Sequence, residues 1–277
     1  MSKPLEELTI MNDFLFSVVM RQEKYCKPLL EYILNVKIKS LKYIGEQKTI
    51  QAAVPTAKSI RLDVFVEDET DSVYDLEVQT TNRHNLGKRS RYYQSVMDVR
   101  VMEKGGDYDK LKKSFIIFIC SFDPFKSSRY IYTFTTQCVE APGADFEDEA
   151  TKIVINTKGT VGDISEELKA VIKYMDSGIV SNSYTESLDA EVRSVKTDAK
   201  VQVSYMLLQE AFAQREALAV NTNNVMLIRR NMNHMGIADL SRILFVSADN
   251  CKSVIDTINA HPDWDDERVA EEIVWDK

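Results

Sequence analysis

The chain has 277 residues, of which 44% are hydrophobic and 28% are charged, and its formal net charge is -8. This composition supports a large core and excludes a disordered chain. The negative charge argues against a protein that coats nucleic acid, because such binding depends largely on cationic contacts to phosphate. The sequence contains neither a long apolar run nor a signal-peptide pattern, so we expect no membrane span and a cytoplasmic protein.

Two helices are predicted near the N-terminus. Asn12 or Asp13 can cap a first helix through FLFSVVM, because a short polar side chain accepts hydrogen bonds from free backbone N–H groups. Pro28 suits the first turn of a second helix along KPLLEYILNV. Between Ile38 and Ala53 the apolar residues alternate loosely, which indicates a strand or a hairpin.

The stretch from Arg61 to Thr81, RLDVFVEDETDSVYDLEVQTT, consists of two alternating runs joined by an acidic turn. Alternation of apolar and polar residues predicts two strands with one apolar face each. If the turn is centred at Thr70, facing residues have numbers that sum to 140. This register pairs apolar residues with each other: Val66 with Tyr74, Val64 with Leu76, and Leu62 with Val78.

The same register places Asp63 opposite Glu77 and Arg61 opposite Gln79. Directly opposed Cβ atoms in such a pair are about 4.5 to 5.5 Å apart. Two carboxylates held so close repel each other, so a fold that builds such a pair usually neutralises it with a proton or a hard cation. Mg²⁺ commonly uses one or two carboxylates, several waters and substrate phosphate. The pattern favours either a metal site or a solvated acidic strand face.

A long helix is predicted from Arg83 to about Lys104, ending at Gly105 and Gly106. Between Arg83 and Lys113 the sequence has nine Lys or Arg residues against four Asp or Glu residues. Three of these cations lie near the start of the helix: Lys88, Arg89 and Arg91. They form either a solvated basic face or a set of phosphate contacts, which require clustered cations.

Further strands and helices follow in the second half of the chain. Core strands are predicted over residues 114–122, 129–139 and 151–157. After Gly162 the sequence predicts helices through ISEELKAVIKYM and from about Ser187 to Val220, with a break at Asn221 to Asn224. Two short helices within residues 238–260 superficially resemble a helix-turn-helix, but they contain no basic recognition helix, so a packing module is favoured.

The cysteines and histidines are scattered along the chain. Cys26, Cys120, Cys138 and Cys251 have no spacing typical of a disulfide framework, so we expect free thiols. His84, His234 and His261 are equally dispersed, and no local zinc signature occurs.

Several separated blocks occur in the order of a known family. They are a D-x-x-F helix start at Asp13 to Phe16, RLDVFVED, YDLEVQ, KRSRYYQSVMD and GGDYDKLKKSFIIFICSFDPF. Over roughly residues 5–160 the sequence therefore resembles the PD-(D/E)XK nuclease family transposases, also called Rpn or recombination-promoting nucleases. The resemblance implies a restriction-endonuclease-like α/β core with a central mixed sheet flanked by helices. It also implies Mg²⁺-dependent endonuclease cleavage of DNA in recombination or mobile elements.

The resemblance also implies roles for individual residues. Asp63 corresponds to the metal-binding Asp, Glu77 to the second acid, and Gln79 to the position of the motif's Lys. The backbone carbonyl of Val78 is then an additional metal ligand. Gln79 departs from the broad superfamily pattern because an amide carries no charge. The missing positive charge is therefore expected from a residue such as Lys88 or Arg91, and DNA contacts are expected from Lys88, Arg89 and Arg91.

The resemblance predicts a nuclease-like domain over residues 1–160 and a helical domain over residues 161–277, with self-association as a homodimer. Two other functions remain open. One is a non-catalytic interaction protein that keeps the nuclease scaffold and uses its helical half for contacts. The other is a DNA regulator that uses residues 238–260, which the acidic tail disfavours.

Overall fold

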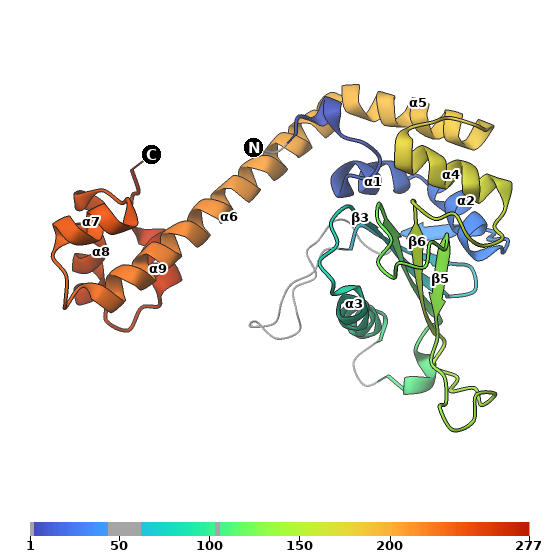
Figure 1. Cartoon of the computed structure of the whole chain (residues 1–277), viewed down its shortest axis with the longest axis horizontal. Helices are drawn as coiled ribbons and strands as arrows, with labels where there is room; N and C mark the ends of the chain where they lie inside the picture. The colour runs from blue at the N-terminus through green and yellow to red at the C-terminus, as the bar shows by residue number, and fades with distance from the viewer. Residues whose placement is uncertain (1–2, 44–61, 103–105, 277) are drawn as a thin grey trace. The chain divides into compact units, whose positions relative to one another are not determined.

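The structure is a computed structural model that describes residues 3–43, 62–102 and 106–276. Its internal contacts divide the chain into two compact units, Lys3–Val201 and Gln202–Lys277. The first unit thus continues well beyond residue 160, the limit predicted for the nuclease-like domain. Each unit is described by itself below, and Figure 1 gives the labels of the elements.

A mixed sheet of six strands forms the centre of the first unit, in the order β1-β2-β3-β4-β6-β5. The strands are β1 (Leu41–Tyr43), β2 (Val64–Asp68), β3 (Val73–Gln79), β4 (Ser114–Cys120), β5 (Ile131–Phe134) and β6 (Ala150–Asn156). Strands β3, β4 and β6 run parallel, whereas β1, β2 and β5 are antiparallel to their neighbours. Parallel strands need helical coverage on both faces, and the sheet has it.

Helices cover both faces of the sheet (Figure 1). One face packs against α3 (Leu86–Val101), whose Tyr93 and Met97 form a core cluster with Phe65, Ile116 and Phe118. The opposite face carries a layer of helices: α1 (Asp13–Met20), α2 (Glu23–Leu34), α4 (Glu166–Ser177) and α5 (Ser183–Thr197). Two short 3₁₀ helices, Leu5–Glu7 and Tyr108–Lys110, complete this unit.

The register predicted for the central hairpin is confirmed. Val64 pairs with Leu76, Val66 with Tyr74, and Glu67 with Val73. Each pair of numbers sums to 140, because this register alone matches the apolar residues of the two strands. The predicted pairing of Arg61 with Gln79 lies outside the described residues.

The polar face of β3, opposite the predicted apolar face, is buried as well. All residues of β3 except Gln79 are buried, including Asp75 and Glu77. The reason is that β3 lies inside the sheet, between β2 and β4, with α3 on one face and α1 on the other. The acids therefore face the packed layer under α3 rather than open solvent.

Several predicted boundaries differ from the structure. Asn12 caps α1 as predicted, since its side chain accepts a hydrogen bond from the Leu15 N–H. Helix α2 begins at Glu23, before the predicted start, so Pro28 lies inside the helix and not in its first turn. The residues that precede Pro28 in this helix include the buried Tyr25 and Cys26. Helix α3 ends at Val101, before the glycines predicted to end it.

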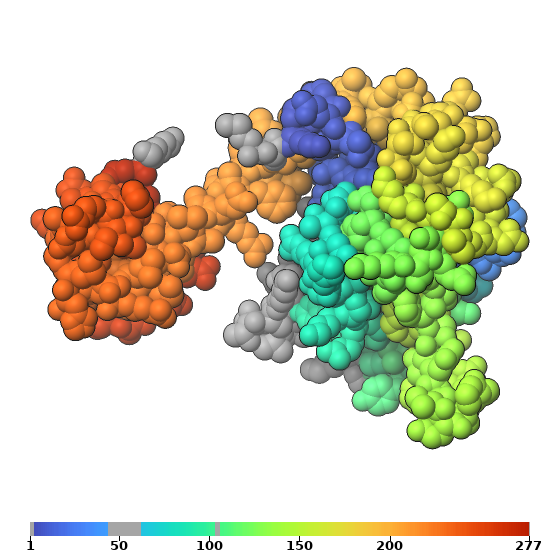
Figure 2. Space-filling model, in the orientation of Figure 1, coloured from blue at the N-terminus to red at the C-terminus, as the bar shows by residue number. Residues whose placement is uncertain are grey.

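The core strand predicted over residues 129–139 is shorter and more exposed than expected. Only Ile131–Phe134 forms β5, which is an edge strand of partly exposed residues. After β5, residues 135–149 are almost all exposed and contain no strand before β6. Figure 2 shows this segment projecting from the body of the first unit. The repeated charges of its EDEA end favour solvent, which explains why the alternating pattern did not extend the strand.

The second unit is helical, as predicted, with different breaks. Helix α6 (Ala199–Asn231) runs through Asn221–Asn224, where a break was predicted, and the break lies instead at Asp198, whose side chain caps α6. Asparagine has weak helix propensity, but the buried Val225 and Ile228 hold this part of the helix in a core. The other helices are α7 (Ile237–Leu244), α8 (Ala248–Ala260) and α9 (Asp266–Glu272).

The helices of the second unit enclose one apolar cluster that contains Leu240, Cys251, Val254 and Val269. This agrees with the packing module predicted for residues 238–260. The four cysteines are free thiols, as expected. No described helix is both long and apolar enough to cross a bilayer.

Candidate active site

Asp63 and Glu77 lie side by side at the end of the central hairpin. The main-chain N–H of Asp63 donates to Glu77 Oε1 at 3.0 Å, and the main-chain N–H of Val78 donates to Asp63 Oδ2 at 3.3 Å. Asp63 lies one residue before β2, outside the strand ladder. These two hydrogen bonds therefore replace the ladder in holding the two carboxylates together.

A third carboxylate, Asp75, belongs to the same cluster and was not predicted. Asp75 lies two residues before Glu77 in β3, so both side chains face α3. Its exposed fraction is 0%, and neither of its carboxylate oxygens has a hydrogen-bond partner among the described residues. The spacing of two in YDLEVQ could have revealed it, since strand residues i and i+2 share one face.

The carboxylates are strongly perturbed by their surroundings. Burial, followed by the negative charge of Asp63, raises the pKa of Asp75 well above its ordinary value, and the Arg89 charge opposes the shift. Burial and the charges of Asp63 and Asp75 likewise raise the pKa of Glu77, against the Asp63 N–H bond and Arg89. Burial and mutual repulsion therefore favour the protonated forms of Asp75 and Glu77 in the absence of a cation.

Arg89 is the cation that reaches this cluster. Its guanidinium donates to Gln79 Oε1 at 2.5 Å and to the Tyr93 hydroxyl at 2.9 Å, and lies 3.6 Å from Glu77 Oε2. Arg89 and Tyr93 are four residues apart on α3, so both point toward the sheet. Burial raises the pKa of Tyr93 to about 12, so its hydroxyl stays protonated.

The other two predicted cations occupy different positions. Lys88 and Arg91 are exposed on α3. The sequence favoured one of these two for the charge near Gln79, whereas the structure brings Arg89 there. Helix geometry separates the three residues, because positions one and two apart on a helix do not share a face.

The mixed sheet with helices on both faces, and paired acids at the end of its central hairpin, defines a restriction-endonuclease-like fold. The family model for the PD-(D/E)XK nuclease family transposase matches residues 10–158, so the chain belongs to this family. Proteins of the PD-(D/E)XK group are generally nucleases that act on DNA and use divalent metal ions. The comparisons found no matching curated protein and no matching solved structure.

The donor atoms of the cluster fit a hard divalent ion. Within the described part of the chain, no three or more His, Cys, Asp and Glu side chains form a ready metal cage. Mg²⁺ does not need one, since it commonly takes one or two carboxylates and keeps several waters. Asp63 and Glu77 would supply the carboxylates, and Asp75 is buried beside them with no hydrogen-bond partner among the described residues.

Proposed function

We propose that the chain is a Mg²⁺-dependent DNA endonuclease that hydrolyses phosphodiester bonds. The observation that carries the proposal is the joined pair of Asp63 and Glu77, with Arg89 spanning Glu77 and Gln79. The family's description as transposases supports a role in DNA recombination or mobile elements.

Asp63, Glu77 and the backbone carbonyl of Val78 would hold the ion in this proposal. Mg²⁺ supplies two effects when bound: it makes a water more acidic and offsets charge on the phosphate oxygens. The Asp63–Glu77 hydrogen bonds fix the carboxylate orientations before DNA binds. Such preorganisation avoids the cost of reorienting charged groups during the reaction.

Gln79 and Arg89 replace the lysine of the superfamily motif. The Gln79 carbonyl oxygen is occupied by Arg89, which leaves the Gln79 amide N–H groups to orient a water or a phosphate oxygen. Arg89 contributes the positive charge that Gln79 lacks. Lys88 and Arg91, exposed one and two residues from Arg89, contact the DNA backbone.

Self-association as a homodimer belongs to the same proposal. Helix α6 exposes a series of apolar side chains: Val203, Met206, Leu207, Phe212 and Val220. Exposed apolar surface of this kind marks interaction sites. Light scattering of the full chain, compared with Leu207→Lys, tests this point, and a monomeric wild type would refute it.

Plasmid cleavage with and without Mg²⁺ tests the central proposal. Asp63→Asn should lower the cleavage rate by about 100-fold or more, since loss of a ligand exceeds the usual 10- to 100-fold effect of residues around a metal site. Asp71→Asn is the matched control, because Asp71 lies on the same hairpin with 78% of its side chain exposed. Its positive φ of 64° suits asparagine.

Two outcomes would overturn the proposal. The first is full cleavage by Asp63→Asn under conditions where the wild type cuts. The second is a wild type that neither cleaves DNA nor binds Mg²⁺ or Mn²⁺ in calorimetry. The second result would favour a non-catalytic interaction protein that retains the nuclease scaffold.

A further inference from the structure

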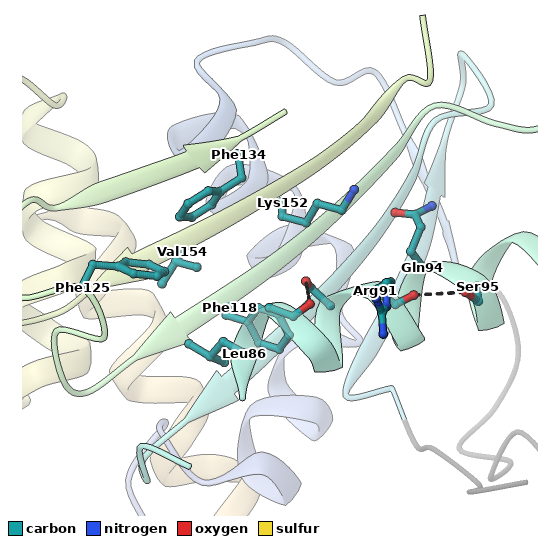
Figure 3. Close-up of a pocket in the computed structure, with 11 residues that line it drawn as sticks. Leu86, Arg91, Gln94, Ser95, Phe118, Phe125, Phe134, Lys152 and Val154 are labelled. Carbon is teal, nitrogen blue, oxygen red and sulfur yellow. Dashed lines mark hydrogen bonds between the residues drawn. The ribbon is translucent and has the colours of Figure 1, made fainter. Parts of the chain in front are cut away.

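A cavity of about 470 Å³ lies between α3 and the strands β4, β6 and β5, next to the candidate active site. Figure 3 shows its lining, with Phe118 and Val154 on the sheet, Phe125 and Phe134 at one end, and Lys152 to the right of Phe134 in this view. Arg91 lines it from the helix. None of these residues takes part in holding the acids or the ion in the proposed function.

Phe118 connects the cavity to the acids. In the parallel register of β3 and β4, Phe118 is the direct neighbour of Glu77. The Arg89 guanidinium carbon lies 5.6 Å from the centre of the Phe118 ring, so one ring borders both sites. Adjacent strands are about 4.8 Å apart, so the Phe118 side of the cavity lies about one strand spacing from Glu77, and Phe134 on β5 lies three strand spacings, about 14 Å, from β3.

The end of the cavity presents aromatic rings to solvent. Phe125 packs against Phe134 with ring centres 5.1 Å apart, and against Tyr132 at 4.7 Å. Phe125 and Phe134 nevertheless keep exposed fractions of 41% and 43%. Exposed aromatic rings beside a cavity are the usual platform on which single-stranded nucleic acids stack their bases.

The charges around the cavity suit a phosphate. Arg91 and Lys152 both line it, and the described lining contains no Asp or Glu. The Lys152 ammonium makes a 3.4 Å contact with the Ala150 carbonyl and also acts electrostatically on Asp98 of α3. Arg91 is exposed, so its guanidinium is accessible to a ligand. Planar aromatic walls with cations at their edge match a base with its adjoining phosphate better than a purely apolar ligand.

We propose that this cavity takes an unpaired base of the substrate, stacked on Phe125 and Phe134, with the adjoining phosphate on Arg91 and Lys152. The volume lies in the range of about 300 to 1,000 Å³ that small-molecule sites occupy, which accommodates one nucleotide. The inference rests on the proposed function and names its substrate class: DNA with an unpaired or extruded nucleotide near the cut. Unpaired bases enter such pockets at the least cost, because no base pair has to be broken.

The test is the affinity of the full chain for two duplexes of one sequence in EDTA, where no cleavage occurs. One duplex is fully paired, and the other carries a single unpaired 2-aminopurine, whose fluorescence falls when it stacks. We expect the wild type to bind the second duplex about 5- to 100-fold more tightly, as base stacking on aromatic residues provides. Its fluorescence should fall on binding.

Two variants connect this preference to the cavity. Phe134→Ala removes a stacking ring and should abolish the preference, whereas Phe146→Ala, an exposed phenylalanine on the projecting segment, should leave it intact. Gly87→Leu should also abolish it by filling space, because Gly87 lines the cavity and a Cβ added there meets no atom within 4 Å. Gly87→Ala, which adds one methyl group, is its matched control.

Equal affinity of the wild type for the two duplexes would overturn the inference, as would a preference that survives in both Phe134→Ala and Gly87→Leu. Circular dichroism of each variant establishes that it is folded. The result is separate from that of the proposed function. A preference without any cleavage would refute the nuclease alone, and Mg²⁺-dependent cleavage without the preference would refute the cavity alone.

Discussion

Glu77 accepts a hydrogen bond from the main-chain N–H of Asp63 at 3.0 Å, although fourteen residues separate them in the chain. The bond uses one carboxylate oxygen, Oε1, and leaves Oε2 facing Arg89 at 3.6 Å. The two carboxylate oxygens therefore have different partners. Oε1 is hydrogen-bonded to the end of the hairpin, and Oε2 faces the positive charge of Arg89.

Glu77→Gln separates these two contacts. The amide oxygen can still accept from the Asp63 N–H, so the hairpin end should keep its shape, but the negative charge is lost. We expect Mg²⁺ affinity to fall about 10-fold or more, because substitutions around a metal site commonly lower metal affinity by about 10- to 100-fold. Calorimetry with Mg²⁺ measures this, and far-ultraviolet circular dichroism checks the fold. Unchanged affinity would contradict the role of Glu77.

Asp75→Asn tests the unpartnered buried acid through stability. The pKa of Asp75 is raised in the folded state, so the folded state binds more protons than the unfolded chain above the unfolded pKa of about 3.9. Stability is therefore greatest at low pH and falls as pH rises toward the raised folded pKa. Removing the charge should flatten this fall.

At pH 8 and without metal, we expect Asp75→Asn to raise the free energy of unfolding by about 1 kcal/mol or more, because the amide cannot ionise and each unit of raised carboxyl pKa costs about 1.4 kcal/mol when the group ionises in the folded state. Urea unfolding between about pH 5 and pH 8 measures the slope. Asp71→Asn is again the control, since an exposed acid should change little. An equal slope in Asp75→Asn and wild type would contradict the prediction.

Arg89→Lys keeps the charge but loses the geometry. Lysine cannot donate at once to Gln79 and Tyr93 while facing Glu77, because it lacks the planar fork of arginine. We expect the cleavage rate to fall about 10-fold or more, with the loss of orientation at Gln79. Arg89→Ala should also destabilise the fold by about 1 to 3 kcal/mol, since Glu77 would remain buried without its cation. Wild-type cleavage by Arg89→Lys would contradict the assignment.

Lys88→Ala and Arg91→Ala should weaken DNA binding and also its dependence on salt. Each lost phosphate contact should reduce the slope of log affinity against log salt by about 0.9 for duplex DNA. Binding measured at several salt concentrations gives the slope directly. Lys173→Ala, which removes an exposed cation from α4, should leave it unchanged. The same slope in all three variants and the wild type would exclude the α3 cations as DNA contacts.

The sequence predicted the architecture best where local pattern and tertiary packing agree. The pairing of Val64 with Leu76 followed from matching apolar residues, and β4 followed from the continuous apolar run SFIIFIC. The fold class was predicted by the resemblance and is confirmed by the mixed sheet. The hairpin register and strand β4 could be predicted because the apolar pattern of residues close together in the sequence determines them.

Features that depend on contacts between distant parts of the chain could not be predicted from the sequence. The sequence did not reveal that Asp75 and Glu77 are buried, because the helix that covers them, α3, follows β3 in the chain and packs on it only in the folded protein. The break predicted at Asn221–Asn224 followed helix propensity, which the core around Val225 overrides. The cavity draws on α3, β4, β5, β6 and the segment around Phe125, so no single stretch carries its signal.

Among the three helix cations, Arg89 could have been identified. Tyr93 is a large, partly apolar residue within the predicted helix, which favours a side facing the sheet, and a residue four positions earlier shares its face. The contacts of the individual site residues with metal and DNA remain predictions.

Asp75, which has no hydrogen-bond partner among the described residues, also affects the stability of the folded chain. Burial and repulsion by Asp63 make the ionised form of Asp75 costly in the native state. An ion bound beside the acids would relieve that repulsion and stabilise the native state through mass action, by about 2.7 kcal/mol at a concentration 100 times its dissociation constant. The supply of divalent ions would then govern how much folded protein survives.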